Sequence, residues 1–86
     1  MNQIQINALG RMDAGEFLVE HRYGELGDHI EYFFLSDKMF VAPQTVGALR
    51  RRGWIENYEA PDRRWRGGKY RITEAGRKAL AKGAKP

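Results

Sequence analysis

The order of helix and strand signals between Thr45 and Leu80 leaves few folds open to this chain. TVGALRRR has Val46 and Leu49 three residues apart and stops at Gly53, which predicts a helix with one buried face. Two short β-like runs follow, WIENY and KYRIT, separated by the Pro- and Gly-containing segment EAPDRRWRGG. A helix followed by a hairpin, with Ile55 and Ile72 facing inward, is therefore expected.

Two more helices are expected on either side of this unit. Pro43 suits the first turn of the middle helix, which we place at residues 43–52. Thr73 is a helix cap for a last helix whose apolar face contains Ala75, Ala79 and Leu80. Residues 2–14 predict a first helix, because Ile6, Leu9 and Met12 recur every three residues. The competing interpretation makes QIQI a strand and lets Asn7 cap a shorter helix.

Residues 16–34 allow two interpretations. EFLVEHRY and HIEYFF are rich in aromatic and branched residues, which favours two strands joined through YGELGD. IEYFFLSDKMF also suits a helix that turns Ile30, Phe33 or Phe34, and Leu35 inward. The sequence leaves both open.

The segment LSDKMFVAPQTVGALRRRGWIE resembles the core of a winged helix-turn-helix. Ser36 fills the position where two helices touch, and the buried positions of the motif are occupied by Leu35, Met39, Val41, Val46 and Leu49. GWIENY…KYRITEAGRKAL is similar to the wing and closing helix of the MarR and PadR types of bacterial or phage transcriptional regulator. The resemblance covers residues 35–80.

This resemblance implies an α+β winged helix-turn-helix with three helices and a C-terminal β-hairpin wing, to which residues 16–34 would add extra strands. Residues 1–86 would form one domain with a frayed tail at 81–86. One departure stands out: Phe40 occupies the turn where the motif has Gly, and a turn there needs positive φ. A remodelled turn, or a strand in place of the preceding helix, is therefore also expected.

Charge is distributed unevenly along the chain. Residues 1–49 have a net charge of −4, residues 50–86 have +8, and the whole chain has +4. This asymmetry predicts a positive face that attracts a polyanion. With the resemblance, it predicts major-groove contacts from the middle helix and phosphate or minor-groove contacts from a wing at 59–69. The candidate DNA-binding residues are Gln44, Thr45, Ala48, Arg51 and Arg52 on the helix, and Arg63, Arg64, Trp65, Arg66, Lys69 and Arg71 on the wing.

These residues also allow interpretations that do not involve binding of DNA. The arginine run also suits a solvated helix end, where cations complement the helix dipole. Trp65 could fold back onto the hairpin or contact a protein. His21 and His29 bracket acidic residues, but one loop makes a weak metal site.

The function expected from the sequence is sequence-specific binding of double-stranded DNA by a small transcriptional regulator. The alternative is a winged-helix protein-interaction module, such as a phage-encoded accessory or inhibitor protein. A homodimer, formed through the first helix or HIEYFF, or a protein partner fits either function. We expect a cytoplasmic protein that is not an enzyme, with no cofactor, metal, small-molecule ligand or membrane partner, since the chain lacks cysteine and a long apolar run.

Overall fold

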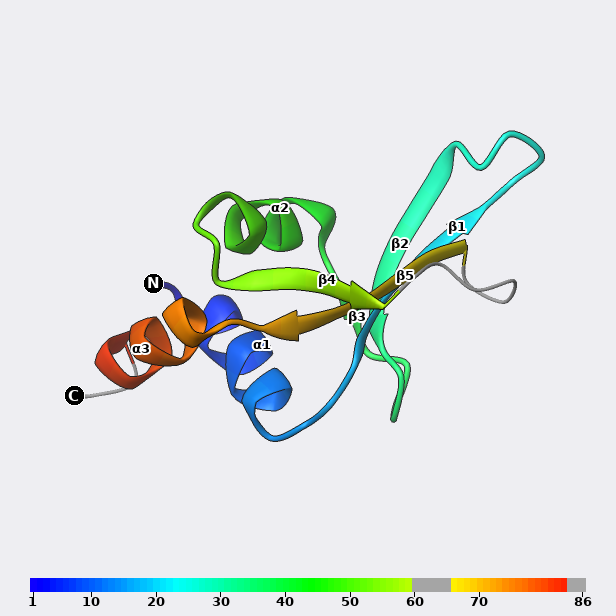
Figure 1. The fold of residues 1–86 in the computed structure, drawn as a ribbon. Coiled ribbons are helices and arrows are strands. Elements are labelled where there is room, and N and C mark those ends of the chain that lie inside the picture. Colours follow the sequence, from blue (N-terminus) through cyan, green and yellow to red (C-terminus); the bar gives the residue numbers. More distant parts are fainter. Residues whose placement is uncertain (60–65, 84–86) are drawn as a thin grey trace.

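The computed structural model of the chain describes residues 1–59 and 66–83. Figure 1 shows the helices and strands that these residues form. In chain order they are α1 (Gln3–Asp13), β1 (Leu18–Tyr23), β2 (His29–Phe34), β3 (Phe40–Val41), α2 (Pro43–Arg51), β4 (Ile55–Glu59), β5 (Arg66–Ile72) and α3 (Glu74–Gly83). The strands form one antiparallel sheet in the order β3-β2-β1-β5-β4.

The fold is not the three-helix winged helix-turn-helix with a C-terminal hairpin that the sequence predicts. It is a small α+β domain whose five-stranded antiparallel sheet extends well beyond a single hairpin. His29–Phe34, where the motif requires a helix, forms β2 and pairs along its whole length with β1. The helical interpretation of this segment is therefore wrong, because cross-strand pairing of its aromatic and branched residues outweighs a weak helical periodicity.

The chain turns between β2 and β3 without placing strain on Phe40. The positive φ, 60°, belongs to Lys38, whose N–H donates to the Phe34 carbonyl at 2.9 Å. Phe40 itself is extended in β3 and lies opposite Phe33. The turn of the winged-helix motif is thus replaced by a strand connection.

The predicted cap of the last helix, Thr73, is confirmed, and α1 begins at a cap that was not predicted, Asn2. The Asn2 side chain accepts from the Gln5 N–H at 2.8 Å, and the Gln5 side chain accepts from the Asn2 N–H at 3.2 Å. This capping box starts α1, so the QIQI strand is wrong. At α3, the Thr73 hydroxyl accepts from the Gly76 N–H at 3.0 Å.

The core lies between the helices and one face of the sheet. Alternate strand residues face it, and Ile55 lies opposite Ile72 in the β4–β5 pair, as predicted. The remaining members of the cluster are Ala8, Leu9 and Met12 of α1, Val46 and Leu49 of α2, and the strand residues Leu18, Tyr32, Phe34, Val41 and Tyr70. The β1–β2 hairpin projects away from the helices (Figure 1), which makes the molecule 45 Å long and 24 by 20 Å across.

Three side chains do not occupy their predicted environments. Met39, expected in the core, is 57% exposed. Ala75, expected on the apolar face of α3, is also exposed, and the buried residue of that helix is Gly76. Ser36 does not separate two helices; its hydroxyl donates to the Glu16 carboxylate at 2.6 Å.

Candidate nucleic-acid interface

The helix α2 has defined ends on both sides. Pro43 occupies its first turn after an extended Ala42. At the other end, the Gly53 N–H donates to the Arg50 carbonyl and the Trp54 N–H donates to the Leu49 carbonyl, both at 3.0 Å. With Gly53 at φ 72°, this is a Schellman ending. The ending holds the arginine run at the last turn of the helix and just beyond it.

The side of α2 away from the core carries the predicted DNA-contacting residues. Val46 and Leu49 are completely buried, which turns the opposite surface outward. Gln44 and Arg51 are exposed there, and Thr45 and Ala48 are partly exposed. Because these four positions belong to one helix of about 14 Å, the structure brings them together on one element.

The arginines at the end of α2 have no carboxylate partner among the side chains that the structure describes, those of residues 1–58 and 66–83. The guanidinium of Arg50 lies 5.3 Å from the centre of the Tyr70 ring, and that of Arg52 lies 5.1 Å from the Trp54 ring. Arg51 lies along the helix, with its Nη1 3.3 Å from the position of a Cβ on Gly47. These contacts orient the three cations, and no described carboxylate forms an ion pair with them.

The other arginines in the described ranges are engaged within the protein. Arg66 donates to two backbone carbonyls of the β1–β2 hairpin. The rest form ion pairs: Arg11 with Glu16 and Asp37, Arg22 with Glu20, Arg71 with Glu56, and Arg77 with Asp13. The arginines at the end of α2 therefore differ from the other described arginines, which pair with carboxylates or backbone carbonyls of the protein.

A buried carboxylate lies beneath this surface. Glu20 is 3% exposed, and its Oε1 accepts hydrogen bonds of 3.0 Å from the hydroxyls of Tyr32 and Tyr70. Its Oε2 accepts from the Nε of Arg22, also at 3.0 Å. Burial, together with the hydrogen bond to Glu20, raises the pKa of Tyr32 to about 12. The hydroxyls of Tyr32 and Tyr70 and the guanidinium of Arg22 satisfy the Glu20 carboxylate, which forms no ion pair with the α2 arginines.

The described wing residues, Arg66, Lys69 and Arg71, do not share the surface of α2 that carries the predicted contacts. Arg66 is fixed by the carbonyls of Arg22 and Gly24, each at 3.0 Å. Since Tyr70 faces α2, strand alternation turns Lys69 and Arg71 toward the opposite face. Arg63, Arg64 and Trp65 lie outside the described residues.

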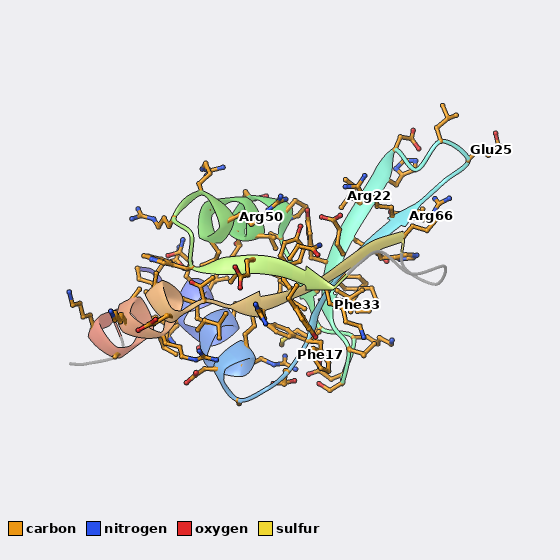
Figure 2. All side chains as sticks on the ribbon, in the orientation of Figure 1. Phe17, Arg22, Glu25, Phe33, Arg50 and Arg66 are labelled. Carbon is orange, nitrogen blue, oxygen red and sulfur yellow. The ribbon has the colours of Figure 1, made fainter. Side chains whose placement is uncertain are left out.

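On that opposite face, Lys69 lies 5.0 Å from the Phe17 ring centre. Arg71 is 5.4 Å from the Tyr58 ring centre and pairs with Glu56 at 2.9 Å. Figure 2 shows Arg22 and Arg50 on one side of the strands and Phe17 and Phe33 on the other. Among the predicted contacts that the structure describes, those on α2 therefore lie together, and Lys69 and Arg71 lie apart from them.

Sequence reasoning missed Arg50 as a member of this surface, and it missed the ion pair between Arg22 and the buried Glu20. Arg50 belongs to the same run as Arg51, but its contact with Tyr70 depends on the packing of α2 against the sheet. Arg22 and Glu20 are two residues apart on β1, a spacing that puts both on one face. This spacing could have indicated the pair of Arg22 and Glu20 from the sequence.

The histidines of the β1–β2 hairpin are occupied locally. The Nδ1 of His21 lies 2.9 Å from the Glu31 carboxylate, and His29 lies 3.8 Å from that of Asp28. In the described part of the chain, no three His, Cys, Asp or Glu side chains gather as a metal site would require.

No helix within residues 1–59 and 66–83 has the length and apolar character to cross a membrane. Comparisons with protein-family models, curated proteins and solved structures found no match.

Proposed function

We propose that the protein binds double-stranded DNA through α2 and recognises sequence with it, as a transcriptional regulator does. The observation that carries the proposal is the group Arg50, Arg51 and Arg52, which is without carboxylate partners in the described part of the chain. Uncompensated arginines bind phosphates, because each contact releases a condensed counterion from the duplex. The proposal uses α2 itself and no longer requires a winged-helix fold.

The dimensions of α2 support a major-groove contact. A major groove about 12 Å wide admits one helix. Gln44 and Arg51 can each bond a purine in two places, which discriminates bases by about 1–3 kcal/mol. Ala48, between them on the same side, is small enough to let the helix approach the bases. Arg50 and Arg52, next to Tyr70 and Trp54, are positioned for phosphates.

A salt titration of duplex binding tests the proposal. The variant Arg50→Ala/Arg52→Ala should lower the slope of log K against log salt by about 1.8, since both arginines are placed on phosphates and each lost phosphate contact contributes about 0.9. The matched control is Arg77→Ala/Lys78→Ala on α3, which removes the same charge from side chains that pair with Asp13 and Glu74. Fluorescence anisotropy with a labelled duplex measures both.

The control should change the slope by less than half a unit, because its charges are already compensated. Equal changes of the slope in the two variants would mean that the net charge of the protein, rather than the arginines of α2, determines binding. A wild-type protein without duplex affinity at low salt would end the proposal.

A further inference from the structure

Exposed apolar side chains gather around one hollow, which shares Thr45 with the predicted DNA-contacting residues of α2. Ile4, Met39 and Phe40 are 63%, 57% and 66% exposed, and all three line a hollow of about 340 Å³ between α1, β3 and the start of α2. Buried core residues contribute to the lining: Ala8, Phe34 and Val41. Apolar surface concentrated in this way marks an interaction site.

The apolar surface continues along α1. A second hollow shares Asn7, Arg11 and Met39 with the first and reaches Leu80 of α3. An eleven-residue helix is about 16 Å long, so the two hollows follow α1 over most of its length. The patch is larger than a pocket for one side chain.

The electrostatics of the first hollow favour a second copy of the chain. Arg11 is the charged residue that lines it, and its guanidinium is 2.6 Å from Glu16 and 2.9 Å from Asp37. The segment from Gln3 to Gly10 has no charged side chain. Two copies that each have a net charge of +4 can therefore meet here without repulsion between like charges at the contact.

The residues around the hollow can supply both parts of a two-fold interface. An isologous contact uses the same patch on both subunits, so the patch must supply both a projecting group and a space to receive it. Ile4 projects at the rim on α1, while Met39 and Phe40 border the space on the strand side. Both requirements are met within one patch.

We propose that the chain forms a symmetric homodimer in which Ile4 of each copy packs between Met39 and Phe40 of the other. Thr45, at the start of α2, lines the same hollow, so the first turns of the two α2 helices face the dimer interface. The arginine ends of α2 then point away from the interface. Dimerisation does not depend on DNA binding, so either proposal can fail alone.

Sedimentation equilibrium over a wide range of protein concentration tests the dimer. We expect a mass approaching twice the 9.9 kDa of the chain. Ile4→Glu should weaken association by about 100-fold or more, because it puts a carboxylate in an apolar interface. Ile4 is on the exposed side of the first helical turn, where Glu is well tolerated, so circular dichroism should show an intact fold.

Leu26→Glu is the matched control, because Leu26 is 90% exposed in the β1–β2 turn, outside the patch. It should dimerise like the wild type. A wild-type chain that remains monomeric at the highest concentration would overturn the proposal and leave the hollow to a different partner. A dimer that Ile4→Glu does not weaken would also overturn it, since the interface would lie elsewhere.

Disulfide trapping tests the placement of side chains in the dimer. The natural chain has no cysteine, so each introduced thiol is the sole one in its chain. A mixture of Ile4→Cys chains with tagged Met39→Cys chains should form a mixed disulfide under mild oxidation. Ile4→Cys mixed with tagged Leu26→Cys should not. Dimerisation without the first disulfide, or with equal yields in both mixtures, would contradict the proposed packing.

Discussion

The guanidinium of Arg50 lies 5.3 Å from the centre of the Tyr70 ring. The hydroxyl of the same ring donates a 3.0 Å hydrogen bond to the buried carboxylate of Glu20. Tyr70 thus links an exposed cation of α2 to the interior of the sheet, through one aromatic face and one polar end. The orientation of Arg50 therefore depends on the carboxylate of Glu20, which lies on β1, next to the strand that carries Tyr70.

Replacing Glu20 should destabilise the protein strongly. Glu20→Ala removes the acceptor for Tyr32, Tyr70 and Arg22, and should lower the free energy of unfolding by about 3–5 kcal/mol. Glu20→Gln keeps one acceptor and should lose less. Urea denaturation measures both, with Glu56→Ala as the control, whose exposed ion pair contributes about 0–1 kcal/mol. Equal losses for Glu20→Ala and the control would refute a structural role for this cluster.

Two helical glycines should respond in opposite directions to alanine. A Cβ on Gly76 would overlap the Trp54 carbonyl oxygen and lie 2.8 Å from Ile72 Cγ1, so Gly76→Ala should destabilise by roughly 1–3 kcal/mol. Gly10, in α1, has open space at its Cβ position, so Gly10→Ala should stabilise by about 1 kcal/mol. Thermal unfolding measures both. A stabilised Gly76→Ala variant would show that α3 does not pack closely on Trp54.

The elements that could be predicted are those determined by neighbouring residues. Asn2, Pro43 and Gly53 set helix ends through contacts within a few residues, so α1 and α2 begin and end within a residue or two of their predicted limits. Ile55 and Ile72 were placed correctly because their strands follow one another in a hairpin. In each case the sequence contains both partners of the interaction close together.

The sequence could not decide between a strand and a helix for β2, because the burial of this strand does not alternate. Tyr32, Phe33 and Phe34 are all buried in succession, since both faces of the strand are covered there. A strand covered on both faces lacks the period of two that separates strand from helix in a sequence. Its partner β1 also lacks alternating burial at its start, because Leu18, Val19 and Glu20 are buried in succession.

The two predicted contacts in the middle of β5, Lys69 and Arg71, face away from the predicted contacts on α2. The exposed strip from Gln44 to Arg51 follows from helical periodicity alone. The orientation of Lys69 and Arg71 was implied by the inward placement of Ile72, since neighbouring strand residues point to opposite faces. The contact between Arg50 and Tyr70 depends on tertiary packing, which no local pattern contains.

Base recognition by α2 should depend on Gln44. If α2 enters the major groove, Gln44→Ala should reduce discrimination at one base pair by about tenfold, corresponding to one lost bidentate contact. Binding to unrelated sequences should remain unchanged, because Gln44 carries no charge. Selection from a randomised duplex library measures the preference. Gln3→Ala, which alters an exposed glutamine of α1, should leave the preference intact, and a loss of discrimination in that variant would contradict the assignment.

Stability should decrease in acid through a range that Glu16 determines. The hydrogen bonds from Arg11 and then Ser36 lower the pKa of Glu16 from 4.5 to about 2. The folded state therefore holds Glu16 ionised where the unfolded chain takes up a proton, so its stabilisation is complete above pH 4.5 and is lost as the pH falls toward 2. Glu16→Gln should lower the melting temperature at pH 7, and its difference from the wild type should vanish near pH 2. Glu74→Gln, at an exposed ion pair on α3, is the control and should show a much smaller change. A Glu16→Gln difference that persists undiminished at pH 2 would mean that the side chain stabilises the fold by packing rather than by its charge.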